Sequence, residues 1–425
     1  MVSSKIQERE QHQFHAQSSV AASLTRQQQL ITPVLVIPYR VKQVRLSGFA
    51  NDSQAKEISE ILDKKAFIKA DRVDSVVSID NQQLLKGIYK IPIYSSDIQL
   101  TAQFKKKDIQ HKLTLLKNLR NLEAIDTPFL MVSISDMRGI DNEPQLSIDG
   151  NALNLKPGGR GFFFKSGLHA EISKNDLVNF TGEELNVELN LTLRGMEEFS
   201  ILPVADHTQT QLSSNWPHPQ FLGSQLPKER NISDAGFTAD WRTNRFSNNS
   251  STVLERCIEQ LLCEDIAGLY FGVNFIDPVD VYLQTERALK YAILFIGLSF
   301  ITFFIFEHVG QQRIHPIQYT LVGLAIATFY LLLVSLGEHM ALGWAYLIGA
   351  LSCTGLLLGY VRYVFGDFRY GLMFCGALLS LNGVLYVIIQ AEDFALLMGA
   401  LLVFFVLGVL MWVTRKVDWY GVVGR

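Results

Sequence analysis

Five long apolar runs in the last third of the chain constrain its fold more than any other feature. They cover residues 288–306, 317–336, 341–361, 370–389 and 394–413. Each is about 20 residues long, the length that an α-helix needs to cross the hydrocarbon core of a bilayer. Residues 289–425 carry 13 charged side chains, against 66 in the first 288 residues. These runs, separated by short loops, predict an all-α bundle of five transmembrane helices and not the core of a soluble protein.

Charges in the connecting loops predict how the bundle is oriented. Basic residues occur in the first and third loops and in the tail: Arg313, Arg362, Arg369, Arg415, Lys416 and Arg425. The second and fourth loops contain Glu338, Glu392 and Asp393 and no Lys or Arg. Because basic loops are retained in the cytoplasm, we expect a cytoplasmic C-terminus and a periplasmic location for the residues before the first run. The expected location is a bacterial inner membrane, crossed several times, with the lipid bilayer as the main partner.

The first 32 residues are polar and rich in Gln, without an apolar run of the kind found in export signals. A large external domain needs such a signal. We therefore expect an N-terminal span that precedes this sequence, with residues 1–32 as its polar, helical continuation outside the membrane.

Residues 33–277 show the pattern of a β-rich domain. Leu185, Val187, Leu189, Leu191 and Leu193 alternate with polar residues, which is the period of a half-buried strand. Shorter runs at 33–39, 91–104, 129–134 and 270–276 also read as strands. Helical patterns between them are mostly missing, which argues against parallel βαβ units. The fold class that we expect is an α + β membrane protein, with an antiparallel, sandwich-like periplasmic domain followed by the membrane domain, residues 278–425.

The junction between the two predicted domains resembles a helix start. Asp277 is a suitable N-cap and Pro278 suits the first helical position. A helix from residue 279 would run without a breaker into the first membrane span.

Composition excludes several classes of protein. The first 288 residues sum to a formal charge of −4 and contain no basic stripe, so a nucleic-acid partner is not expected. The chain shows no P-loop, no G-x-S-x-G nucleophile elbow and no H-E-x-x-H zinc motif. The sequence thus predicts no catalytic residue, no metal ligand and no cofactor.

Several segments together resemble the CreD family of inner-membrane proteins. They are SDMRGI (135–140), GIYKIPIYSSDIQLTAQF (87–104), NWPHPQFLGSQLPKERNISDAGFTADW (215–241), TERALKYAILFI (285–296), HPIQYTLVGLAIATFYLLL (315–333) and VDWY (417–420). The resemblance implies an N-terminal span, a large periplasmic domain and a cluster of C-terminal spans. It also implies a role in cell-envelope integrity, control by a carbon-source-responsive two-component system and a response to β-lactams. It implies no catalytic residues.

The block at 215–223 is a candidate recognition loop. His218 lies between two prolines that hold the backbone extended, with Trp216 and Phe221 beside it. The functional interpretation is an exposed aromatic loop that binds a partner. The structural alternative is a rigid corner whose aromatic rings fill the core.

Within the third and fourth apolar runs, Gly349, Cys353, Gly355, Gly359 and Asn382 are candidates for helix packing. Small residues four apart allow close approach of two helices. This favours packing inside the bundle, with homodimerisation as the alternative. Asn382 is expected to form an interhelical hydrogen bond.

Cys257 and Cys263 are a possible disulfide in an oxidising compartment. If their segment is helical, the six-residue spacing places the two thiols about 9 Å apart along the axis, too far to bridge.

The function favoured at this point is a non-enzymatic inner-membrane protein that supports the envelope or its stress response. Its external β domain would act as a sensing or bracing module. Partners beyond the bilayer would be other envelope proteins or a second copy of the chain. The alternative is a membrane transporter or a protein that handles lipids or envelope precursors through the helix bundle. Intramembrane carboxylates, usual in ion-coupled transporters, are missing from the runs.

Overall fold

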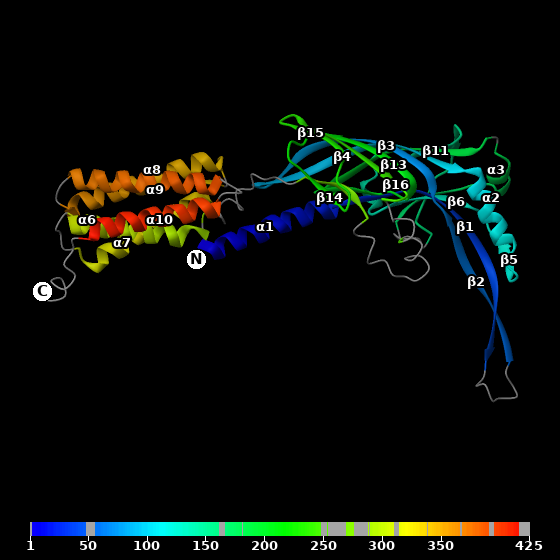
Figure 1. The fold of residues 1–425 in the computed structure, drawn as a ribbon, viewed down its shortest axis with the longest axis horizontal. Coiled ribbons are helices and arrows are strands. Elements are labelled where there is room, and N and C mark those ends of the chain that lie inside the picture. Colours follow the sequence, from blue (N-terminus) through cyan, green and yellow to red (C-terminus); the bar gives the residue numbers. More distant parts are fainter. Residues whose placement is uncertain are drawn as a thin grey trace. The chain divides into compact units, whose positions relative to one another are not determined.

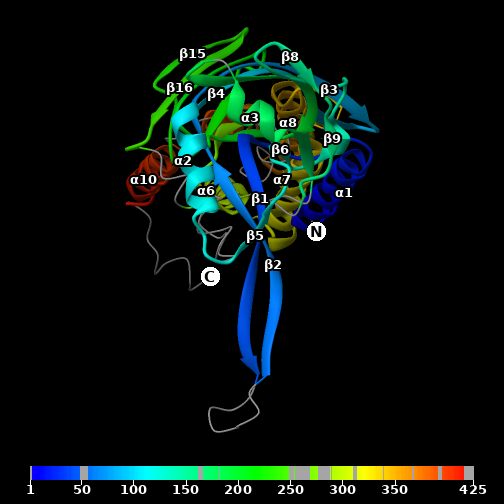
Figure 2. The same cartoon turned by 90° about the vertical axis from the view of Figure 1, so that its right-hand side faces the viewer.

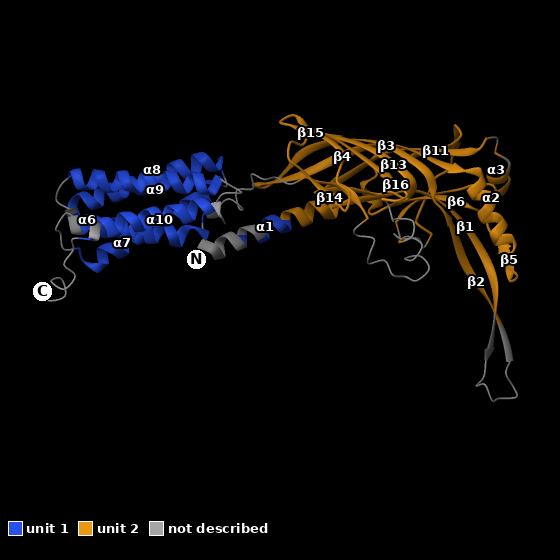
Figure 3. Ribbon diagram, in the orientation of Figure 1, with its two compact units in different colours: residues 1–15, 278–425 blue, residues 16–277 orange. Residues whose placement is uncertain are grey.

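The computed structural model describes residues 2–47, 56–160, 166–180, 182–247, 253, 269–275, 288, 290–309, 314–337, 339–365, 368–390 and 395–415. The chain divides into two compact units, shown in Figure 3. Unit 1 comprises residues 1–15 and 278–425, and unit 2 comprises residues 16–277. The helix predicted from residue 279 falls in a segment, 276–287, that lies outside the described residues, as do Cys257 and Cys263.

The chain begins with helix α1, Val2–Ser23, whose residues divide between the two units. The described elements of unit 2 include the helices α2 (Lys106–Lys117) and α3 (Lys174–Asn179) and a short 3-10 helix, η1 (Met137–Gly139). In α2, Asp108 lies in the first turn and Lys117 in the last, so both charges oppose the partial charges of the helix ends.

The described strands of unit 2 form two sheets (Figure 1). The first sheet contains β1 (Gln28–Ser47), β2 (Lys56–Ile68), β5 (Leu122–Ile125), β6 (Phe129–Ile134), β9 (Lys156–Pro157), β10 (Gly167–Glu171), β12 (Glu198–Leu202), β14 (Pro219–Gly223) and β17 (Phe271–Phe275). The second contains β3 (Ala70–Lys86), β4 (Tyr89–Lys105), β7 (Gln145–Ile148), β8 (Asn151–Leu153), β11 (Glu184–Met196), β13 (Ala205–Ser214), β15 (Glu229–Ser233) and β16 (Gly236–Asn244).

The two sheets bury a common core. Residues of β1, such as Leu30 and Leu35, belong to the same apolar cluster as Val73 of β3 and Leu189 of β11. The alternation predicted for 185–193 is confirmed, because all five apolar side chains of β11 at these positions are buried. The expected sandwich-like packing of a β-rich region is therefore present in unit 2.

The sheets are not wholly antiparallel. β1 pairs in parallel with β12, and β3 pairs in parallel with β13 over Ala70–Ile79. These pairings join strands more than a hundred residues apart, so local patterns could not reveal them. The strand expected at 33–39 is also longer than its apolar run, because β1 extends from Gln28 to Ser47.

Strands β1 and β2 form a ribbon that leaves the body of unit 2 (Figure 2). The pairing of β1 with β5 ends at Val41 and that with β6 at Val36, whereas β1 and β2 pair as far as Ser47 and Lys56. Beyond position 41 the described residues of this ribbon have two strands.

Unit 1 contains five C-terminal helices, α6 (Ala292–Val309), α7 (Pro316–Gly337), α8 (Leu342–Phe365), α9 (Phe368–Gln390) and α10 (Ala395–Thr414). Three have apolar stretches long enough to cross a membrane, at Pro316–Gly337, Leu342–Val364 and Phe368–Gln390. The stretches in α6 and α10 are shorter, Ala292–Glu307 and Leu397–Trp412. A large β-rich region followed by an apolar helical region is thus the architecture of the chain.

Candidate functional site

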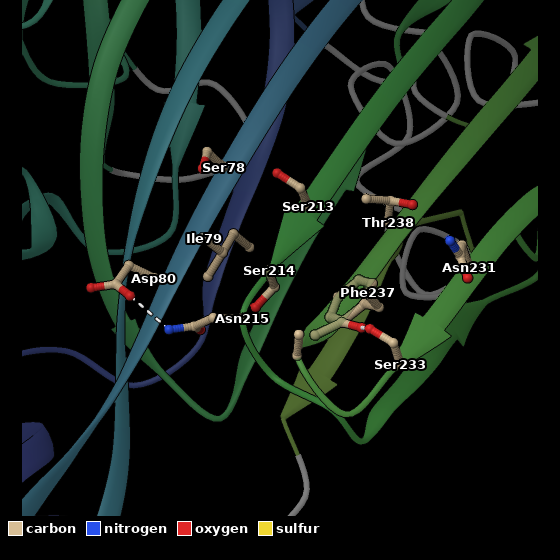
Figure 4. Close-up of a pocket in the computed structure, with 12 residues that line it drawn as sticks. Ser78, Ile79, Asp80, Ser213, Ser214, Asn215, Asn231, Ser233, Phe237 and Thr238 are labelled. Atoms are coloured by element: carbon tan, nitrogen blue, oxygen red, sulfur yellow. Dashed lines mark hydrogen bonds between the residues drawn. The ribbon is translucent and has the colours of Figure 1, made fainter.

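An open pocket in the second sheet is the main candidate site of unit 2 (Figure 4). Its volume is about 470 Å³. The lining comes from the middle of β3, the end of β13 and the β15–β16 hairpin: Ser78, Ile79, Asp80, Ser213, Ser214, Asn215, Asn231, Ser233, Ala235, Gly236, Phe237 and Thr238. These strands are neighbours because β13 pairs with β3 on one side and with β16 on the other.

Asn215 fixes one wall of the pocket. Its Nδ2 donates to Asp80 Oδ1 at 2.7 Å, a contact drawn in Figure 4, and its Oδ1 accepts from the backbone N–H of Asn81 at 2.8 Å. Asn81 Nδ2 in turn donates to Ser214 Oγ at 2.7 Å. These bonds tie the middle of β3 to the end of β13 and the turn after it, so the wall is held in place before any ligand arrives.

The chemistry of the lining is that of a binding site. Hydroxyl and amide groups can both donate and accept hydrogen bonds. The acidic lining residue, Asp80, has both carboxylate oxygens engaged, one by Asn215 and one by Gln82 Nε2 at 2.9 Å. A neutral, hydroxyl-rich molecule fits such a surface better than a metal ion or a strongly charged group.

The serines of the pocket have no histidine partner among the residues that line it. His207 lies on the same strand as Ser213, and six residues of extended chain separate them, roughly 20 Å. Across the described parts of the chain, no group of three or more His, Cys, Asp or Glu side chains could hold a metal ion.

The predicted recognition loop borders this pocket. Asn215 is both the first residue of the NWPHPQFLG block and part of the pocket wall. Phe221 contacts Phe237, a lining residue, and Trp241, with ring centroids 5.6 Å apart in each case.

The three loop residues differ in their surroundings. Trp216 and Phe221 are half-buried and pack against the core of unit 2, whereas the His218 side chain is exposed. Phe221 therefore supports the pocket from behind, and His218 is the member of the set that a partner could reach.

A buried hydrogen-bond network joins the end of α1 to the sheets. Gln28 is fully buried, and its Nε2 lies 3.1 Å from Thr25 Oγ1, 3.0 Å from the Asp136 carbonyl and 3.1 Å from the Arg194 carbonyl. Gly139 packs so closely here that a Cβ would lie 2.1 Å from Gln28 Nε2. We call Thr25, Gln28, Asp136, Arg138 and Gly139 the α1 joint.

Arg138 completes the α1 joint. Its guanidinium bonds the carboxylate of Asp136 and donates to the Ala22 carbonyl at 2.9 Å, in the last turn of α1, where a cation is favoured. The Arg138 hydrogen bond lowers the pKa of the Asp136 carboxyl below its ordinary value. The sequence analysis did not identify this network, although SDMRGI, which contains three of its residues, was among the segments that carried the family resemblance.

In the helix bundle, Asn382 is buried, and its Nδ2 donates to the Leu378 carbonyl at 3.0 Å. The Tyr346 hydroxyl donates to the Asn382 carbonyl at 2.7 Å, which links α8 to α9. The shorter interhelical bond thus uses the backbone carbonyl of Asn382, the Tyr346 hydroxyl also lies 3.4 Å from Asn382 Oδ1, and Asn382 Nδ2 bonds within α9.

The small residues of α8 fall into two groups. Gly349 is buried against Phe329 of α7. Cys353 Sγ lies 3.3 Å from the carbonyl of Ala325, which is also in α7. Gly355 and Gly359 are exposed, with open space where a Cβ would lie. These two glycines do not pack inside the bundle, and homodimerisation stays a prediction for them.

Comparison with known proteins gives the family. The family described as "Inner membrane protein CreD" matches residues 1–420. The "Inner membrane protein CreD" of Escherichia coli (strain K12) is 32% identical over 427 residues, which cover 98% of this chain and 88% of that protein. Both matches extend over unit 2 and the apolar helices alike. The chain belongs to the CreD family of inner membrane proteins.

Proposed function

We propose that this protein is a non-enzymatic inner-membrane protein that contributes to cell-envelope integrity or to the envelope-stress response. Unit 2 would lie in the periplasm as a sensing or bracing module. The observation that carries this proposal is the α1 joint, because it anchors a helix in the β-structure through the buried Gln28 side chain and through the Arg138 guanidinium, which bonds both Asp136 and the last turn of α1. A module attached in this way can transmit a load or a binding event to the helix.

The membrane topology within this proposal has five spans, α6 to α10, and a cytoplasmic C-terminus. Basic loops on one side and acidic loops on the other support this orientation. A reporter that works only in the periplasm, fused after Arg425, should be inactive, and a cytoplasmic reporter at the same place should be active. The opposite pattern would overturn the periplasmic location of unit 2.

The pocket supplies the sensing function. We assign it a neutral, hydroxyl-rich envelope component, such as a glycan, because Ser and Asn side chains dominate its polar lining. The exposed His218 at its border would add a contact.

A complementation experiment tests the role of the pocket. In a strain without the gene, the wild-type chain should restore growth under envelope stress, and Asn215→Ala should restore it poorly, because the wall of the pocket loses its bonds to Asp80 and Asn81. Gln211→Ala, at an exposed position on β13, the strand that precedes Asn215, is the matched control. Full rescue by Asn215→Ala, at equal protein level, would refute the role of the pocket.

The transporter or lipid-handling alternative calls for a wet path through the bundle near Asn382. The described interior supports the scaffold instead. Its buried polar residues are Ser299, Thr354 and Asn382, and Ser299 and Asn382 bond to backbone carbonyls of their own helices. Labelling of a cysteine placed at 382 by a small water-soluble reagent would favour the alternative, and protection would favour the scaffold.

A further inference from the structure

Strands β3 and β4 continue beyond the second sheet as a two-stranded ribbon. The pairing of β3 with β13 ends at Ile79, and that of β4 with β11 ends at Ile93, but β3 and β4 pair with each other as far as Lys86 and Tyr89. Gly87, with φ +63°, occupies the first position of the two-residue turn, where glycine is favoured in a type II′ hairpin. The ribbon therefore has a compact, well-defined tip.

The tip exposes large apolar side chains. Leu85 is 67% exposed, Ile88 43% and Leu84 38%. These residues lie next to one another at the end of the ribbon, and Tyr89 follows. Several aliphatic side chains gathered on one projecting turn are the composition of a surface that binds an apolar phase.

The charges at the tip have one sign. Residues 81–92 contain Lys86 and Lys90 and no acidic residue. Lysine beside aliphatic and aromatic side chains is the arrangement of segments that rest in the headgroup region of a bilayer, where the apolar groups enter the acyl boundary and the cations meet anionic headgroups. A second protein would be an equal fit for the apolar groups alone, but the unopposed lysines favour an anionic lipid surface.

The position of the ribbon in unit 2 agrees with this partner. The last strand before the membrane helices is β17, and the ring of its final residue, Phe275, lies 5.2 Å from the ring of Tyr94 at the base of the ribbon. The backbone N–H of Phe275 donates to the Glu197 carbonyl at 2.7 Å, directly after the end of β11. The described part of unit 2 thus ends, at Phe275, beside the base of the ribbon. From Tyr94 to Gly87, seven residues of strand extend roughly 23 Å.

From these observations we propose that the β3–β4 tip, formed by Leu84, Leu85, Lys86, Ile88 and Lys90, docks into the headgroup region of an anionic phospholipid bilayer. The ribbon is fixed to the end of α1 below its tip, since Ile91 is buried with Val20 and Ala21. At the tip itself, Lys86 Nζ donates to Ser19 Oγ, and Lys90 has no such bond among the described contacts. Docking would hold unit 2 at a set height above the lipid surface. It requires that the chain be anchored in a membrane and is independent of the envelope function proposed above.

Photocrosslinking in nanodiscs tests the proposal on the full chain. A diazirine amino acid is placed at position 85 and, as the matched control, at position 61. Ile61 is 54% exposed and pairs with Lys42 of β1. Lys42 is fourteen residues along β1 from Gln28, which is roughly 46 Å of extended strand. Ile61 is therefore a position on the other ribbon, far from the tip. Illumination should give phospholipid adducts at 85, detected by their mass, and none at 61.

Changes in the lipid composition and in the charge of the tip separate the contribution of the lysines from that of the apolar side chains. Adduct yield at 85 should fall when phosphatidylglycerol is omitted from phosphatidylcholine nanodiscs, and also when Lys86 and Lys90 are both replaced by Ser. Equal yields in the two lipid mixtures would overturn the part assigned to the lysines. Failure to form lipid adducts at 85, equal adducts at 61, or crosslinks from 85 to another polypeptide would overturn the docking itself. Because all substituted positions are exposed, an unchanged melting temperature shows that the variants are folded.

Discussion

Replacement of Gln28 by Leu tests whether the α1 joint is the attachment that we infer. Gln28 has four partner groups: its Nε2 contacts Thr25 Oγ1 and two carbonyls, and its Oε1 accepts from Ser135 Oγ at 3.1 Å. The two hydrogens on Nε2 and the Oε1 acceptor allow three full hydrogen bonds at a time. A buried hydrogen bond contributes about 1 kcal/mol net, so their loss costs about 3 kcal/mol. The added methyl groups of Leu recover about 1–2 kcal/mol. The α1 joint should therefore lose about 1–2 kcal/mol, a roughly 5- to 30-fold change in an equilibrium constant.

Hydrogen exchange, measured by mass spectrometry on the full chain in detergent, reports the local loss of stability at the α1 joint peptide by peptide. Amides in peptides that cover 16–28 and 135–140 should exchange faster by that factor, whereas peptides from the centre of β4 and β11 should not change. Gln211→Leu, an exposed substitution of the same type, is the control and should leave both regions unaltered. Exchange at 16–28 within threefold of the wild type would refute the reasoning, because Gln28 would then not hold the helix end.

Three further predictions follow from the described contacts. Phe221→Ala should destabilise unit 2 by about 2 kcal/mol, as expected for a half-buried ring, whereas His218→Ala should leave its melting unchanged. Asn382→Leu should cost less than about 1 kcal/mol in thermal melts of the solubilised protein, and Tyr346→Phe should cost more, since the bond between helices uses the Tyr346 hydroxyl and a backbone carbonyl. The lowered pKa of Asp136 means that its stabilisation of the α1 joint is present above its ordinary pKa of 3.8 and is lost as the pH falls through the lower, folded-state value. The protection factor of amides in the 135–140 peptide, which removes the pH dependence of intrinsic exchange, should fall at acid pH in the wild type, and Asp136→Asn should show the lower protection already at pH 7.

Period-two alternation located the centre of β11 at 185–193, where every second side chain is apolar and buried. A short continuous apolar run located β6 at 129–134, which is buried on both faces. The same rule missed the ends of β1 and β3, where the strands leave the sheets and the alternation stops. Apolar runs likewise located all five helices of unit 1, since helix length in a membrane is set by bilayer thickness.

The candidate site was harder to predict. Asn215 and Phe221 belong to a block that the sequence singled out, but Asp80, Asn231 and Ser233 join them only through the pairing of β13 with β3 and of β15 with β16. Parallel partners are specified by the whole packed core and not by local sequence. The α1 joint was missed for a related reason, because a lone Gln next to an apolar run carries no signal until Asp136 and Arg194 are placed around it.

The parallel pairings also govern when unit 2 can fold during synthesis. β1 can pair with β12, and β3 with β13, only after those later strands have been synthesised. Almost two hundred residues of the chain therefore leave the ribosome before either parallel pairing can form. The final strand, β17, then inserts between β12 and β14. Until β17 is in place, the facing edges of β12 and β14 have unpaired backbone groups that other chains could bind. Late closure of this kind makes folding slow and exposes the chain to misassembly, so a truncation before residue 271 should yield aggregates and not a smaller stable domain.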